Sequence, residues 1–249
     1  MKRIFFLLIT AVITASILTA CNQIGLSEET VKASENKGVI TEQEQQANKT
    51  INEDYQVVAS LDEEGITIYA KEMDGLYYDF KIDHNNSSFN EPFWMNVTSP
   101  SRPPQIIVED ISGDGTKELI IILTHGYGTG TLIQEAHVYH MENNFHNELL
   151  VDNPMAIVLK NVKSTLLPNE AKINIADKQV AVGLEAEPEY LNNEVGFGSI
   201  IRYHVKDNQL IANIGAQVSP ASFIGDVVIK YEYKDEMYQA KSIEFQTYE

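Results

Sequence analysis

Residues 104–140 read PQIIVEDISGDGTKELIIILTHGYGTGTLIQEAHVYH, a succession of strand-like runs and tight turns. Two runs rich in β-branched residues, 105–109 and 119–123, flank a turn made of acidic, hydroxyl and glycine residues. Neither run alternates cleanly between apolar and polar residues, which is typical of strands buried on both faces. A glycine-rich break at 126–130 leads into a third strand-like run at 132–139. The stretch therefore predicts adjacent buried strands joined by hairpin turns.

Similar short runs, separated by turn signals, fill the rest of residues 55–249. The further expected strands are 55–61, 65–71, 76–82, 93–97, 171–175, 179–184, 200–205, 210–214, 227–233 and 238–246. One helix is expected over 155–167, with Asp152 or Asn153 as its cap and Pro154 in its first turn. The pattern predicts a mainly β fold, a single antiparallel β-rich domain that is a sandwich or barrel-like, with one short helix.

Three local features add detail to this fold. Asp74-Gly75 lies between two strand-like runs, a strong signal for a tight hairpin. The polar stretch 84–90 is expected to be a loop. Trp94 is the only tryptophan, and we expect it to anchor the core, with stacking on a ligand as the alternative.

The N-terminus has the layout of a signal peptide. Basic residues at positions 2–3 precede an apolar run at 4–18, which is too short to span a bilayer comfortably. Small residues then lead to the only cysteine in Leu18–Cys21, which resembles the lipobox of bacterial lipoproteins. The resemblance implies that residues 1–20 are removed and that Cys21 carries the lipid. The alternative is an ordinary cysteine after an uncleaved anchor helix, and in either case no intramolecular disulfide can form.

Residues 21–54 differ in composition from the domain that follows. They are rich in Glu, Gln, Asn, Lys, Ser and Thr and contain no aromatic residue. Such a segment cannot bury enough apolar surface to offset its ordering entropy, so we interpret it as a flexible tether. The expected location is therefore the extracytoplasmic face of the cell membrane, with a lipid anchor. In layout the chain resembles small lipoproteins of low-GC Gram-positive bacteria.

The formal net charge of −18 limits the partners of the chain. Such an acidic surface argues against nucleic acid and against lying flat on anionic lipid. It is compatible with divalent cations or with basic partners, although solubility alone would also account for it.

The turn between the two buried runs has the composition of a cation-binding loop. Oxygen-bearing groups stand at its first, third, fifth, seventh and ninth positions: Asp110, Ser112, Asp114, the carbonyl of Thr116, and Glu118. Calcium takes six to eight oxygen ligands, and a glycine such as Gly115 lets a short loop wrap around the ion. An EF-hand is excluded because its twelfth position would be Ile121 and because the flanking runs are strands.

The pattern Asp-x-Ser-Gly-Asp-Gly-x-x-Glu, followed by an aliphatic strand, resembles the calcium loop of FG-GAP and VCBS-type extracellular repeats. The resemblance covers about twenty residues and implies structural Ca²⁺ ligands at Asp110, Ser112, Asp114, Thr116 and Glu118. The motif occurs once here, so the propeller fold of those families is not implied. The alternative is a tight turn in which Asp110 and Asp114 accept backbone N–H groups while Gly113 and Gly115 adopt positive φ.

Other chemistries have weaker support in the sequence. His137 and His140 are three residues apart, so on a strand they face opposite sides and cannot chelate zinc together. The chain has no Gly-x-Ser-x-Gly elbow, and its single cysteine is assigned to the lipid. Glu185 and Glu187 lie in a polar loop where solvation is expected. We therefore expect no catalytic residues.

These observations favour a membrane-anchored, non-enzymatic binding module with a structural calcium site. Its partner would be another protein or an envelope polymer. Two alternatives stay open: a lipoprotein that captures a solute or ion, and a cell-envelope hydrolase that uses scattered Asp and Glu residues. A cavity with two convergent carboxylates would favour the hydrolase, whereas an exposed apolar patch would favour the binding module.

Overall fold

The computed structural model of the chain describes residues 54–85, 87–141, 147–185 and 187–248. These residues all belong to one compact unit, Lys49–Glu249. The expected signal peptide and Cys21 lie outside the described residues, as does all but the last residue of the expected tether. Within the described part, no helix is long and apolar enough to cross a membrane.

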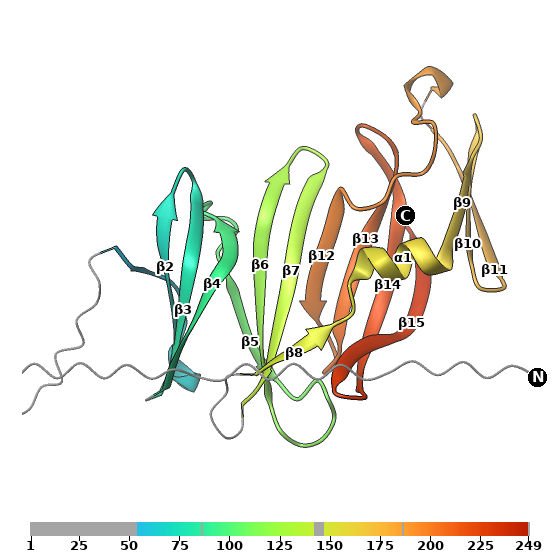
Figure 1. Cartoon of the computed structure of the whole chain (residues 1–249). Coiled ribbons are helices and arrows are strands. Elements are labelled where there is room, and N and C mark those ends of the chain that lie inside the picture. Colours follow the sequence, from blue (N-terminus) through green and yellow to red (C-terminus); the bar gives the residue numbers. More distant parts are fainter. Residues whose placement is uncertain (1–53, 86, 142–146, 186, 249) are drawn as a thin grey trace, which may run out of the picture. The chain divides into compact units, whose positions relative to one another are not determined.

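The fold is mainly β, as the sequence predicts, with 65% strand and 7% helix (Figure 1). The strands of the described residues are β1 (Gln56–Leu61), β2 (Ile66–Met73), β3 (Leu76–His84), β4 (Ser87–Val97), β5 (Gln105–Glu109), β6 (Glu118–Gly128), β7 (Thr131–His140), β8 (Glu148–Val151), β9 (Val162–Leu166), β10 (Glu170–Ile175), β11 (Lys178–Gly183), β12 (Ile200–Val205), β13 (Leu210–Ser219), β14 (Ser222–Lys234) and β15 (Met237–Thr247). The helices are α1 (Pro154–Asn161) and two short 3₁₀ turns, η1 (Asp62–Glu64) and η2 (Pro188–Tyr190).

The first sheet is an antiparallel meander with the order β1-β2-β3-β4. The Asp74-Gly75 hairpin is confirmed, because both residues adopt the positive φ that a tight two-residue turn requires. The expected loop at 84–90 is wrong at both ends, because His84 is the last residue of β3 and residues 87–90 begin β4 and pair with β3. Phe89 packs against the core, whereas its neighbours Ser88 and Asn90 are exposed.

The large sheet has the order β12-β13-β14-β15-β8-β7-β6-β5, with an additional pairing of β12 with β7. This pairing closes six strands into a ring, β7-β8-β15-β14-β13-β12, and leaves β6 and β5 as an extension. Strand β7 pairs with β8 at Val138 and Tyr139 and with β12 at Leu132 and Ile133, so its edge is shared between two strands. The β12–β7 and β15–β8 pairings are parallel, which adds a mixed element to the expected antiparallel pattern.

Strand β6 separates two hydrophobic cores. Its residues Leu119–Leu123 are fully buried, which confirms that this run is covered on both faces. Even-numbered positions such as Ile120 and Ile122 belong to the core that extends into the ring. Odd-numbered positions such as Ile121 and Leu123 pack in the second core against the first sheet, where Trp94 is also buried. Strand β5 is only partly buried, contrary to expectation, because it is the edge of the large sheet.

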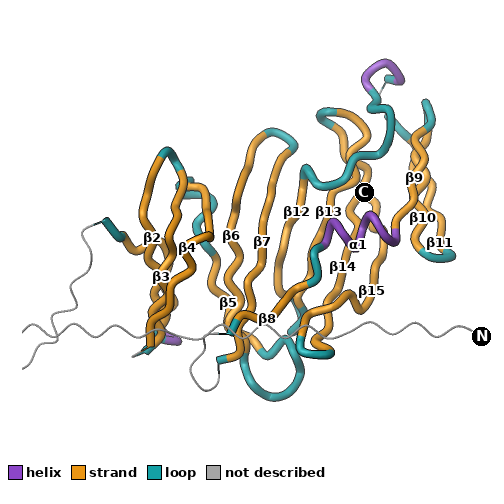
Figure 2. The backbone as a smooth tube through the Cα atoms, viewed as in Figure 1, coloured by secondary structure: helices purple, strands orange, loops and turns teal. Residues whose placement is uncertain are grey.

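Helix α1, the one α-helix in the described part of the chain, is shorter than the sequence predicts (Figure 2). Its start is as expected, since the side chain of Asn153 accepts the N–H groups of Met155 and Ala156 and Pro154 occupies the first turn. Residues 162–166 form β9 instead of the last helical turns and pair with β10. Val162 and Thr165 are β-branched, and the β10 ladder supplies the backbone hydrogen bonds that a longer helix would have supplied.

Candidate functional site

The acidic loop connects β5 to β6 beyond the last ladder pair, Glu109 with Glu118. Gly113 and Gly115 adopt φ values of 79° and 93°, a conformation that side chains other than glycine rarely accept. A Cβ atom at either position would meet nothing within 4 Å, so the backbone conformation, and not crowding, requires glycine.

Asp110 organises the backbone of the loop. Its Oδ1 accepts hydrogen bonds from the N–H of Gly113 at 2.8 Å and from the hydroxyl of Ser112 at 3.4 Å. Its Oδ2 accepts the N–H of Gly115 at 3.1 Å. The loop thus has the tight-turn geometry in which acidic side chains satisfy backbone donors.

Asp114 occupies the exposed tip of the loop. Its Oδ1 accepts the N–H of Thr116 at 2.7 Å, and its own N–H donates to the hydroxyl of Ser112 at 3.4 Å. The N–H of Thr116 is the main reason that the pKa of the Asp114 carboxyl lies below its usual value. The carboxylate therefore stays charged at neutral pH and is available to a cation.

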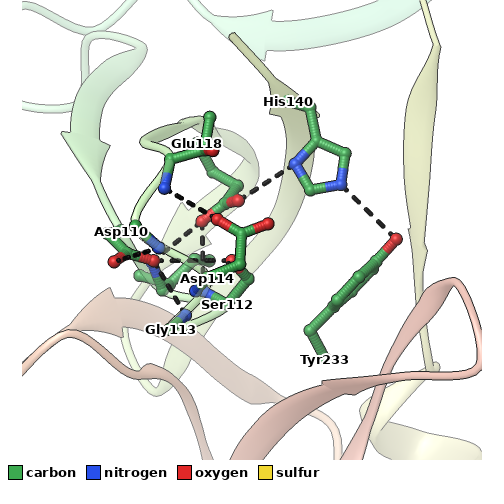
Figure 3. A network of polar contacts seen from close by, with 10 residues as sticks. Asp110, Ser112, Gly113, Asp114, Glu118, His140 and Tyr233 are labelled. Atoms are coloured by element: carbon green, nitrogen blue, oxygen red, sulfur yellow. Dashed lines mark hydrogen bonds and ion pairs between the residues drawn. The ribbon is translucent and has the colours of Figure 1, made fainter. Parts of the chain in front are cut away.

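Glu118 is fully buried and joins the loop to the neighbouring strands (Figure 3). Its Oε2 accepts the N–H groups of Ile111 at 2.9 Å and Ser112 at 3.1 Å. Its Oε1 lies 3.0 Å from Nδ1 of His140, the residue opposite it across the β6–β7 ladder. The Nε2 atom of His140 contacts the hydroxyl of Tyr233 on β14 at 3.4 Å. A single carboxylate thus links the turn with β7 and, through His140, with β14.

The ligand atoms of Asp114, Glu118 and His140 all lie within 4.8 Å of one another, the one such group among the described residues. Of the five expected ligands, the structure brings Asp114 and Glu118 together. It directs Asp110 and Ser112 to hydrogen bonds within the loop and leaves Thr116 as a donor to Asp114. His140, the third member of this cluster, was not among the ligands expected from the sequence.

The arrangement suits a cation electrostatically. Three carboxylates converge on the loop, and the one lysine within it, Lys117, forms an ion pair with Glu64 at 2.8 Å. Tyr238 on β15 is 1% exposed, and its hydroxyl has no hydrogen-bond partner among the described residues. Burial, reinforced by the neighbouring Glu118 carboxylate, raises the pKa of the Tyr238 phenol. A dication would relieve the negative potential that these groups share.

The ligand atoms of Asp114, Glu118 and His140 fit a divalent cation, and the oxygen and nitrogen atoms among them suit different ions. A carboxylate offers about four lone-pair positions, so an oxygen that accepts one N–H keeps capacity for an ion. Oxygen ligands from Asp114 and Glu118 suit Ca²⁺, whereas the imidazole of His140 suits Zn²⁺ better. The three side chains therefore form the group of the described residues in which a divalent cation could be held.

Surface cavities give no support for a paired-carboxylate active site. Three of them have volumes of about 480, 440 and 240 Å³. The first is lined by no carboxylate, the second by Glu185 and the third by Glu135. Each of these three cavities thus offers fewer than the two carboxylates that acid–base hydrolysis of a glycosidic bond requires.

No family model, no curated protein and no solved structure matches the chain.

Proposed function

We propose that the chain is a lipid-anchored, extracytoplasmic binding module whose acidic loop is held in place by a divalent cation. The signal-peptide layout, Cys21 and the composition of the tether support the anchor. The proposed partner is a protein or polymer of the cell envelope, and the proposed ion is Ca²⁺. An enzymatic role has no comparable support, since none of the three cavities is lined by paired carboxylates.

The observation that carries the cation proposal is the position of Glu118. A buried carboxylate is costly unless its charge is compensated. Here two backbone N–H groups and His140 provide part of that compensation, and Asp114 brings a second negative charge within 4.8 Å. A dication between the two carboxylates would neutralise their remaining negative charge and stabilise the position of the loop against β7.

The cation is tested by thermal unfolding of the whole chain in detergent, with Cys21→Ser to exclude thiol effects. Ca²⁺ at ten times its dissociation constant would stabilise the fold by about 1.4 kcal/mol. For a domain of this size that corresponds to a rise in Tm of about 3 to 6 °C over the value in EDTA. The same measurement with Zn²⁺ distinguishes the two ions.

Asp114→Asn is the informative variant, and Asp177→Asn is its matched control. Asp177 is an exposed residue in the β10–β11 turn, remote in sequence from the loop. The rise in Tm should be lost in Asp114→Asn and kept in Asp177→Asn. Equal Tm values in EDTA and in Ca²⁺ for the parent chain would refute the calcium assignment and leave a self-capped turn.

The anchor is tested separately by labelling cells with radioactive palmitate. The chain with Cys21 should incorporate label and sediment with membranes, and Cys21→Ala should do neither. Membrane association of an unlabelled chain would instead indicate an uncleaved anchor helix, which is the alternative raised by the apolar run at 4–18.

A further inference from the structure

A second polar cluster lies toward the other end of the β6–β7 hairpin. His125 occupies a register irregularity in β6, between Thr124 and Gly126. Glu135 and His137 stand two residues apart on β7, so they point to the same face, and they pair across the ladder with Leu123 and Ile121. The hairpin therefore directs two imidazoles and one carboxylate to one region.

The two imidazoles converge on the same carboxylate oxygen. The Nε2 atom of His125 lies 3.3 Å from Oε2 of Glu135, and the Nε2 atom of His137 lies 3.7 Å from it. Both Nε2 atoms are buried, and neither makes a hydrogen bond within the described part of the chain. The side chain of His137 is only 7% exposed. Buried polar atoms without a partner are rare, and an ion or water is a common explanation.

The surroundings of His137 resemble those of a metal-binding histidine. Its Nδ1 atom lies 2.6 Å from Oε1 of Glu148 on β8, and the ring of Trp94 stacks on it with centroids 4.0 Å apart. A carboxylate only accepts hydrogen bonds, so the proton belongs on Nδ1 and the lone pair on Nε2. Metal-ligating histidines almost always donate their other N–H to a carboxylate, carbonyl or water in this way.

The other two residues are suited to complete such a site. The side chain of His125 is 27% exposed, and its Nε2 atom is buried against Glu135. Glu135 is 54% exposed, which leaves its carboxylate free to rotate. His125 and Glu135 also line a cavity of about 240 Å³, together with Met155 and Tyr203.

We propose that His125, Glu135 and His137 bind a divalent transition-metal ion, for which Zn²⁺ is the best match, through the two Nε2 atoms and a carboxylate oxygen. Two histidines with one carboxylate are a known zinc donor set that leaves a fourth position for water or a ligand. Ligand atoms around tetrahedral Zn²⁺ are about 3.3 Å apart, close to the 3.3 and 3.7 Å found here.

Metal binding requires a small closure of the site. The three ligand atoms are not all within 4.8 Å of one another, a criterion that only Asp114, Glu118 and His140 meet in the described residues. The two imidazoles must therefore approach each other as the ion binds. His125 is the residue to move, since it lies at the strand irregularity and is 27% exposed, whereas Trp94 and Glu148 hold His137.

This site is independent of the acidic loop. Leu123, which pairs with Glu135, lies five positions along β6 from Glu118, or about 17 Å in an extended strand. Ile121, which pairs with His137, lies three positions from Glu118, or about 10 Å. The donor sets also differ, because imidazole nitrogen favours Zn²⁺ and oxygen favours Ca²⁺. Absence of metal binding at one site therefore does not imply its absence at the other.

Trp94 gives a direct readout, because the only tryptophan of the chain stacks on a proposed ligand. We would titrate Zn²⁺ and Co²⁺ into the whole chain with Cys21→Ser in detergent, after treatment with EDTA. The expected result is a change in Trp94 fluorescence that saturates at one equivalent of metal, with tetrahedral absorption bands for Co²⁺.

His125→Gln and Glu135→Gln alter partly exposed residues and should fold normally, and each should weaken Zn²⁺ binding more than tenfold. Glu148→Gln should weaken it about 10- to 100-fold, as expected when a carboxylate that orients a ligand is lost. His84→Gln, at the end of β3, is the control and should leave the fluorescence titration unchanged. Absence of Zn²⁺ binding would overturn the assignment, as would an unchanged Zn²⁺ affinity in both His125→Gln and Glu135→Gln or loss of the signal in His84→Gln.

Discussion

Glu118 and His140 face each other across the β6–β7 ladder, with 3.0 Å between Oε1 of the carboxylate and Nδ1 of the imidazole. The side chain of Glu118 is fully buried and that of His140 is 33% exposed. The carboxylate also holds the N–H groups of Ile111 and Ser112. This one contact therefore connects the acidic loop, β6 and β7.

Glu118→Ala is expected to destabilise the domain by roughly 3 kcal/mol, because it leaves two backbone donors and one imidazole without their shared acceptor. Asp114→Ala at the exposed tip should cost clearly less than Glu118→Ala in EDTA. Urea unfolding of both variants in EDTA checks the difference. Similar losses in the two variants would contradict the role assigned to Glu118.

Gly225 in β14 has no room for a side chain. Its φ is 152°, and a Cβ atom would overlap the carbonyl oxygen of Gln246 and lie 2.8 Å from the ring of Phe245. Strain and overpacking together predict that Gly225→Ala loses roughly 3 kcal/mol of stability. Gly183→Ala is the matched control, since nothing lies within 4 Å of that site and its φ is not positive. Equal urea midpoints for the two variants would show that β14 can shift at Gly225.

Much of the β architecture could be predicted, because short runs of apolar and β-branched residues indicate strands and turn residues indicate the hairpins between them. The Asp74-Gly75 turn and the fully buried run 119–123 are such cases. The length of the helix could not be predicted, because residues 162–166 become β9 only through their ladder with β10. The partial exposure of β5 likewise depends on its position at the edge of the sheet, which local sequence does not contain.

The candidate sites show the same division between local and cross-strand information. The acidic loop is contiguous in sequence, so its turn geometry follows from spacing and glycine positions. His140 joins it because it is paired with Glu118, and that register is known only once β6 and β7 are aligned. His137 and His140 lie on one strand, β7, whereas His125, the neighbour of His137, lies on β6 at a local irregularity. The sequence signal for both clusters is therefore the alignment of residues 118–140 as a hairpin.

Asn153 is expected to stabilise the start of α1, because its side chain accepts two N–H groups that the helix leaves unpaired. Asn153→Ala should lower the free energy of unfolding by about 1 kcal/mol, and Asn153→Asp should largely preserve it. Urea unfolding monitored by circular dichroism measures both. An unchanged free energy of unfolding in Asn153→Ala would mean that the packing of Ile157 and Val158 alone stabilises the helix.

The pH dependence of stability should reveal His204 on β12. Burial, followed by the charges of Arg202 and Lys206, lowers the pKa of its imidazole in the folded protein. As the pH falls through about 6.5, the usual histidine pKa, His204 therefore binds a proton in the unfolded chain before it does so in the folded chain. Proton binding then favours the unfolded state, so the free energy of unfolding should fall as the pH is lowered from 7.5 to 5.5 in EDTA. His204→Gln should show a smaller fall than the parent chain. Parallel stability curves for the parent and His204→Gln would show that His204 is protonated equally easily in both states.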